Sequence, residues 1–244
     1  DETFVARSLI ELGMIERNNS RYSEALRHYK RVAEDYRGTE NADAALLAIE
    51  SIWTARRQPD KYLEYLEENS LGATKDDKER EGMYFNAAQQ LYLSGDYAQA
   101  LPSILSYLEK YPEGEGSADA VFFMAECYKA SGEKEKACEC YARAGELSLS
   151  SPSFVELSKL NFASISYDLE RFKDAYDGYS SLLSIANIEG NRHVARLGMM
   201  RSAYRSREYQ AAIDAAAAVK GEPSLSADLS READYVMAKS LLSS

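Results

Sequence analysis

Apolar and small residues recur along the chain at the spacing of amphipathic helices. Ahead of the turn at residues 94–96 they occupy positions i, i+3, i+4 and i+7, which are Tyr84, Ala87, Ala88 and Leu91. After that turn the apolar positions are Tyr97, Leu101, Ile104, Leu105 and Leu108. Both segments follow the 3.6-residue period of a helix, and neither alternates as a half-buried strand does. The pattern predicts two helices joined by a short polar turn.

Two helix starts carry the spacing of a capping box, in which an N-cap side chain and a Glu or Gln three residues later bond free backbone amides. The two pairs are Asp96 with Gln99 and Ser153 with Glu156. We therefore expect a helix to begin at each of these places.

A short motif recurs along the chain: a polar turn, an aromatic residue and, three positions later, an alanine. The alanines are Ala25, Ala100, Ala137, Ala175 and Ala212, and the copy at Lys134 lacks the aromatic residue. The intervals between them are 75, 37, 38 and 37 residues. Because the first interval is twice the others, we expect a hidden copy near residue 62, where residues 59–65 form a turn followed by an aromatic helix start.

This period predicts an all-α fold, a right-handed α-solenoid of about six and a half antiparallel helical hairpins. The array is expected to form a single domain over residues 1–244. Its repeats lie near residues 6–39, 44–78, 81–114, 118–151, 156–189 and 193–224, with a final helix over 225–243.

The copies place the same residue types at equivalent positions. In the first copy these are Leu9, Leu12, Gly13, Ala25 and Tyr29; in later copies they include Tyr84, Ala100, Pro112, Tyr128, Ala137, Tyr141, Ala144, Phe162, Ala163, Ala175, Tyr179, Tyr204 and Ala212. In these positions the chain resembles tetratricopeptide repeat (TPR) proteins, although its repeat is about three residues longer than the family's usual unit. The resemblance implies stacked hairpins whose first helices line a concave groove.

Residues 110–114, 117–120 and 128–132 are similar to the linkers of envelope-associated bacterial TPR proteins, of the Tol-Pal coordination and outer-membrane assembly type. That resemblance, and a chain that begins at Asp1 without an initiator Met, favour the bacterial cell envelope or periplasm. Three cysteines without an obvious pairing favour a reducing compartment, so a cytoplasmic location is the alternative.

Charge narrows the class of partner. The chain has 29 Lys and Arg against 40 Asp and Glu, a formal net charge of −11. Such a balance argues against binding of nucleic acid, which needs a basic face, and against electrostatic docking on anionic lipid. No run approaches about 18 consecutive apolar residues, so we expect no membrane-spanning segment. The acidic runs Glu67-Glu68 and residues 76–81 are expected to be solvated faces.

No arrangement of residues predicts catalysis, a cofactor or a metal site. His28 and His193 are far apart in sequence, and neither has a Cys or carboxylate at the spacing of metal ligands. Cys127, Cys138 and Cys140 are expected to be buried or half-buried thiols. The chain is therefore not expected to be an enzyme.

The expected function is that of a non-catalytic scaffold, which binds a protein or peptide segment in the concave groove. Candidate groove residues lie on the first helices, away from the core positions: Asn86, Gln89, Tyr92, Phe122, Lys129, Asn161, Ser164, Tyr167, Arg201 and Arg205. Tyr, Arg and amide side chains suit recognition of an extended peptide.

Two alternatives stay open: a docking module of a larger envelope enzyme or transport complex, and a glycan-associated envelope protein whose groove tyrosines stack on sugar rings. The TPR family's clamp for the carboxyl-terminal tails of chaperones is not expected, because Ile10 and Met14 stand at two of the positions that it requires. The sequence does not predict an oligomeric state.

Overall fold

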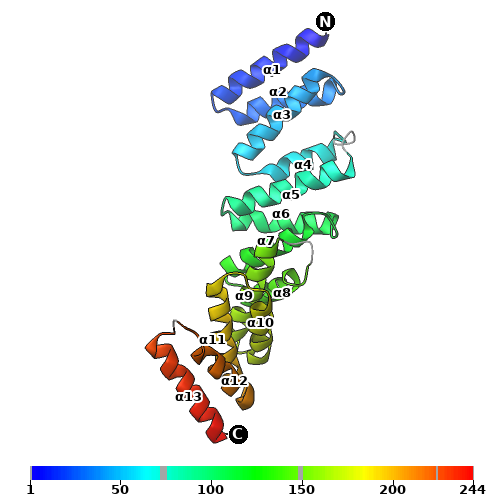
Figure 1. Cartoon of the computed structure of the whole chain (residues 1–244). Helices are drawn as coiled ribbons and strands as arrows, with labels where there is room; N and C mark the ends of the chain where they lie inside the picture. The colour runs from blue at the N-terminus through cyan, green and yellow to red at the C-terminus, as the bar shows by residue number, and fades with distance from the viewer. Residues whose placement is uncertain (1, 72–75, 148–150, 224, 244) are drawn as a thin grey trace. The chain divides into compact units, whose positions relative to one another are not determined.

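A computed structural model describes residues 2–71, 76–147, 151–223 and 225–243, and in this part the chain forms thirteen α-helices and no strand (Figure 1). The chain divides into two compact units. Residues 1–111 contain α1 (Glu2–Asn18), α2 (Tyr22–Asp35), α3 (Glu40–Ala55), α4 (Pro59–Glu68), α5 (Asp77–Leu93) and α6 (Tyr97–Lys110). Residues 112–244 contain α7 (Ser117–Ala130), α8 (Lys134–Ala144), α9 (Pro152–Asp168), α10 (Phe172–Ile185), α11 (Glu189–Arg205), α12 (Tyr209–Lys220) and α13 (Ala227–Ser243).

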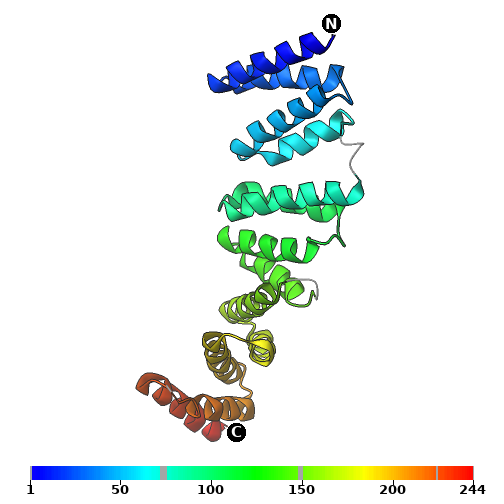
Figure 2. The ribbon, with the colours of Figure 1, turned by 45° about the horizontal axis from the view of Figure 1, so that its top comes forward.

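Consecutive helices pair as antiparallel hairpins, with an odd-numbered first helix and an even-numbered second helix (Figure 2). Within each unit the second helix of one hairpin packs on the first helix of the next, and α13 packs on α12. This repeat of helical hairpins confirms the predicted all-α solenoid class.

A residue with positive φ lies in the turn of each of the six hairpins. In chain order these residues are Ser20, Arg57, Gly95, Gly132, Glu170 and Arg207, with φ between 56° and 81°. Their spacing is 37 or 38 residues throughout. In five of these turns the next backbone amide bonds back to the helix in a Schellman motif, as where Arg21 N–H donates to the Glu16 carbonyl at 2.8 Å. Because Arg57 falls on the same period and α4 begins at Pro59, the hidden copy near residue 62 is confirmed.

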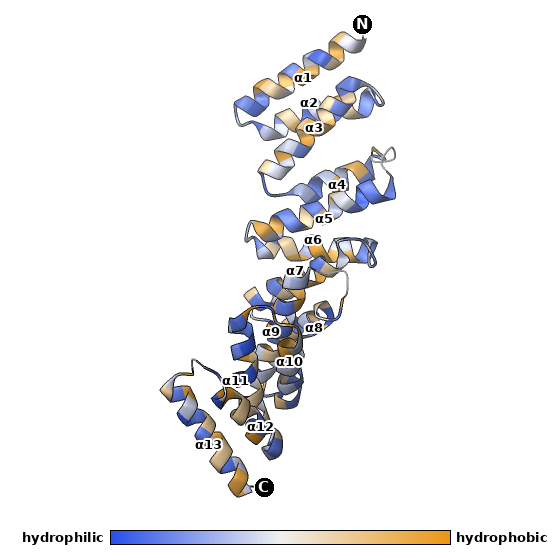
Figure 3. Ribbon diagram, in the orientation of Figure 1, coloured by the Kyte–Doolittle hydropathy of each residue, from blue (hydrophilic) through white to orange (hydrophobic). Residues whose placement is uncertain are grey.

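The repeat alanines lie on the buried side of the second helices, and all are 0% exposed: Ala25, Ala100, Ala137, Ala175 and Ala212. Hydrophobic and hydrophilic residues are interspersed along the helices (Figure 3). None of the helices in the described ranges is long and apolar enough to cross a bilayer.

The buried face of α6 differs from the predicted one. Its buried residues are Ala100, Ser103, Ile104 and Tyr107, whereas Tyr97 and Leu105 are exposed. Two polar groups explain the difference, because Ser103 Oγ donates to Asp60 at 2.7 Å and Tyr107 OH donates to Glu81 at 3.0 Å. With their hydrogen bonds satisfied, these side chains are buried at low cost.

Tyrosine–glutamate hydrogen bonds fasten neighbouring helices to one another. In each, a phenol OH donates to a carboxylate on another helix: Tyr65 to Glu34, Tyr84 to Glu67, Tyr107 to Glu81 and Tyr141 to Glu126. Burial, followed by the hydrogen bond that the phenol donates to Glu34, raises the pKa of Tyr65. Tyr65 therefore stays a neutral donor, and the four tyrosines have a structural role in joining helices.

The expected capping box at Ser153 is wrong. Ser153 lies inside the first turn of α9, whose N-cap is Ser151. Glu156 is buried and accepts hydrogen bonds from the backbone of Asn187 at 3.1 Å and of Ile188 at 3.4 Å, and from Asn191 Nδ2 at 2.7 Å. It therefore caps α11, one hairpin further along the chain. At Asp96 the side chain does accept from Gln99 N–H, at 3.3 Å.

The repeat boundaries stay a prediction, and only the starts of the first helices can be compared with them. The first helices α1, α3, α5, α9 and α11 begin four residues before the predicted repeats at 6, 44, 81, 156 and 193. Parts of the predicted repeat ends, at 72–75, 148–150 and 224, lie outside the described residues. That all the repeats form one domain over residues 1–244 stays a prediction.

Candidate partner-binding surface

In the second unit, two of the predicted groove residues meet at the surface. Lys129 Nζ on α7 donates a hydrogen bond to Asn161 Oδ1 on α9, at 2.9 Å. Ser164 and Tyr167 continue the same side of α9, with Ser164 exposed and the Tyr167 ring 5.3 Å from that of Phe172. Adjacent first helices thus share a face that bears a lysine, an amide, a hydroxyl and a phenol.

The two predicted groove arginines already hold partners within this unit. Arg201 donates to both carboxylate oxygens of Glu232 on α13, at 2.6 and 2.8 Å. This hydrogen-bonded pair raises the pKa of Arg201 and lowers that of Glu232. The Arg205 guanidinium lies 4.6 Å from the Phe172 ring centroid and 3.8 Å from Glu170 Oε1. A partner would contact either arginine only by sharing or displacing these interactions.

Phe122 lies in the core, so its assignment to the groove is corrected. Its side chain is 3% exposed, and its ring stacks on that of Phe154 with centroids 4.4 Å apart and an interplanar angle of 10°. The central turns of α7 are buried on nearly every side. On such a helix, spacing alone does not distinguish the groove side from the core side.

In the first unit the predicted groove residues lie on α5. Asn86 is exposed, Gln89 and Tyr92 are half-buried, and the Tyr92 ring packs against that of Tyr97 at 5.8 Å. Of these predicted residues, Asn86 also lines a pocket that the sequence did not indicate.

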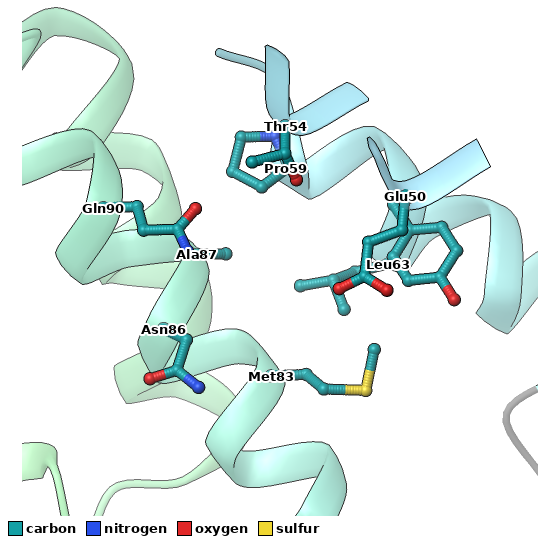
Figure 4. Close-up of a pocket in the computed structure, with 9 residues that line it drawn as sticks. Glu50, Thr54, Pro59, Leu63, Met83, Asn86, Ala87 and Gln90 are labelled. Carbon is teal, nitrogen blue, oxygen red and sulfur yellow. The ribbon is translucent and has the colours of Figure 1, made fainter. Parts of the chain in front are cut away.

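This pocket lies between α3, α4 and α5, and we name it the α3–α5 pocket. Its lining is Glu50, Thr54, Pro59, Tyr62, Leu63, Met83, Asn86, Ala87 and Gln90, around a cavity of about 130 Å³. Glu50, Leu63, Met83 and the Gln90 amide surround the space (Figure 4). Small-molecule sites usually enclose about 300–1,000 Å³, so this cavity suits a single amino-acid side chain better than a cofactor.

The floor of the pocket is apolar and its rim is polar. Tyr62, Leu63 and Ala87 are buried. Burial, and then the negative charge of Glu50, raise the pKa of Tyr62 to about 12, so the phenol stays neutral. In the described part of the chain, no side chain forms a hydrogen bond or ion pair with the Glu50 carboxylate or the Gln90 amide. These groups are left to bond solvent or a ligand.

Other polar clusters have structural explanations. His193 Nδ1 contacts Glu222, which also accepts from Arg196 at 3.0 Å and links α11 to the end of α12. No three of His, Cys, Asp and Glu gather as a metal site among the described residues. Cys127 and Cys138 are buried and Cys140 is half-buried, as expected from the sequence.

Comparisons with known proteins identify similar folds. No protein-family model matches the chain, and no curated protein matches it in sequence. PilF of Pseudomonas aeruginosa is 15% identical, with a TM-score of 0.44 over 89% of this chain and 91% of that one. The apo form of RapI is 13% identical, with a TM-score of 0.45 over 88% and 75%. The TPR2AB domain of yeast Sti1, in its complex with pHSP90, is 14% identical, with a TM-score of 0.38 over 97% and 98%. Because these TM-scores are all below 0.5, the fold class is assigned from the chain's own helices.

Proposed function

We propose that this chain is a non-catalytic scaffold of the TPR type, which binds a segment of a partner protein along the exposed side of its first helices. The observation that carries the proposal is the Lys129–Asn161 hydrogen bond, which joins α7 and α9 at the surface. With Ser164 and Tyr167 alongside, that face offers donors, acceptors and a ring at helical spacing.

Such a face suits an extended segment. Main-chain carbonyl and amide groups of an extended peptide need partners, and Lys, Asn and Ser side chains supply them. A tyrosine adds contact area at a low cost in conformational entropy. Since Ile10 is half-buried and Met14 exposed and apolar, the first hairpin supports no clamp for a carboxyl-terminal carboxylate.

We also propose that the scaffold works in the bacterial cell envelope. The support is the likeness of residues 110–114 and 117–120 to linkers of envelope TPR proteins. Fractionation of cells that carry the tagged full-length protein tests this: recovery in the periplasmic fraction is expected, and recovery with cytoplasmic markers would contradict it.

Site-specific photo-crosslinking tests the scaffold proposal. A photoreactive phenylalanine analogue replaces Lys129 on α7 in the full-length protein, and in a matched variant it replaces Lys173, an exposed lysine on the second helix α10. We expect a discrete crosslinked protein from position 129 and none from position 173. Equal crosslinking at the two positions, or none at either, would contradict binding along the first helices.

A further inference from the structure

We propose that the α3–α5 pocket accepts one lysine or arginine side chain of the partner segment, with Glu50 as its counter-ion. The inference rests on the proposed scaffold function and adds which side chain the first unit selects. It is carried by the shape of the pocket, by its unpaired acceptors and by the charge of the unit around it.

The shape fits a long side chain with an apolar stem. Leu63 and Ala87 form a buried floor, and the Met83 side chain extends along one wall (Figure 4). Lys and Arg bury their methylene groups on such surfaces while the charged head stays at a polar rim. Methionine adapts to stems of different shape, because its side chain is unbranched and flexible.

The rim supplies acceptors for a cation. Glu50, which is half-buried, and Gln90, which is exposed, both line the pocket, and neither side chain is bonded to another described side chain. None of the cations at the α3–α4 turn and the start of α4, which are Arg56, Arg57 and Lys61, lines the pocket. Arg56 lies 5.6 Å from the Tyr22 ring centroid, and Lys61 lies 5.2 Å from that of Trp53. A charge-assisted bond to Glu50 is therefore available to an incoming ammonium or guanidinium group.

Other side chains fit less well. An acidic side chain would bring a second negative charge close to Glu50, and an apolar one would remove water from the carboxylate without replacing its hydrogen bonds. Residues 1–111 hold 14 Lys and Arg against 20 Asp and Glu, a net charge of −6. This field attracts a basic segment and repels an acidic one.

A peptide-display selection tests which side chain is preferred. The full chain, E50Q and a control, E64Q, are each challenged with a library of random 12-residue peptides. Glu64 lies exposed on α4 outside the pocket, so E64Q makes the same change of charge without altering the rim. We expect wild type and E64Q to enrich peptides with Lys or Arg at one fixed position. E50Q should lose that preference by about tenfold or more.

The outcomes separate the two proposals. Enriched peptides without a basic preference, or an equal loss in E50Q and E64Q, would overturn the pocket and leave the scaffold function standing. If no version enriches any peptide, the result contradicts the scaffold function, and the pocket is then decided by a direct titration.

That titration uses blocked tripeptides and methyl NMR. The methyl signal of Met83, assigned with M83L, is followed as Ac-Gly-Lys-Gly-NH₂ or its norleucine counterpart is added. We expect the lysine peptide to shift this signal with a dissociation constant on the order of 1 mM, and E50Q to abolish the shift while the other methionine signals stay in place. Equal shifts with norleucine, or an unchanged response in E50Q, would overturn the proposal.

Discussion

Gly198 on α11 lies against the ring of Tyr179 on α10, and its replacement by alanine tests whether close packing between hairpins holds the second unit together. A Cβ at this position would meet three ring carbons of Tyr179 at 2.4–2.5 Å. The ring is nearly buried and has little room to move, so overpacking should cost about 1–3 kcal/mol. Alanine has a higher helix propensity than glycine, which stabilises the folded protein by about 0.8–1 kcal/mol. The expected net effect of Gly198→Ala is a loss of up to about 2 kcal/mol.

The matched control is Gly190→Ala in the same helix, where an added Cβ would meet no atom within 4 Å. It should be neutral or stabilising by up to about 1 kcal/mol. Thermal unfolding followed by circular dichroism should show a Tm lowered by up to about 8 °C for Gly198→Ala. Adding Tyr179→Leu should reverse the sign of the alanine effect. If Gly198→Ala stabilises the protein as Gly190→Ala does, the packing argument is refuted.

Three further predictions concern the second unit. Burial opposes ionisation of Glu156, yet its hydrogen bonds outweigh burial and lower its pKa, so this carboxylate stabilises the fold above the pKa of the unfolded state. Glu156→Ala should therefore cost about 2–4 kcal/mol in urea unfolding at pH 7, and the deficit should shrink below about pH 4.3; a deficit independent of pH would contradict this. Arg207 has a φ of 63°, which strains a residue other than glycine. Arg207→Gly should therefore raise the free energy of unfolding in urea by up to about 1 kcal/mol, whereas a lower free energy of unfolding would contradict this strain. Burial raises the pKa of Cys127 to about 12 and that of Cys140 to about 11, so iodoacetamide should label both slowly at pH 8 and rapidly in urea; fast labelling of the folded protein would show that the thiols are accessible.

The repeat could be predicted from the sequence because it depends on local rules. Small residues that let helices approach stand at a fixed period, and Ala25 and Ala212 at its two ends are both fully buried. The hidden second copy followed from the interval alone, because Tyr62 stands where the other copies have their alanine. Periodicity of this kind needs no knowledge of long-range contacts.

The sequence could not show polar contacts between residues that are 15 to 43 positions apart. Glu67 belongs to an acidic run expected to be solvated, yet it accepts hydrogen bonds from Tyr84 and, at 2.8 Å, from Lys110. Glu156 has the spacing of a local cap but caps a later helix. The same limit applies to the candidate site, since Glu50 acquires its place in the pocket only when α3 meets α4 and α5.

The most direct test of the account is hydrogen exchange in the second unit, with and without the partner segment captured through position 129. Binding along the first helices should slow amide exchange in α9, over residues 152–168, because the bound segment suppresses local opening there. Exchange in the second helix α10, over residues 172–185, should change little. Protection of α10 without protection of α9, while the segment is bound, would contradict the claim that the first helices form the binding surface.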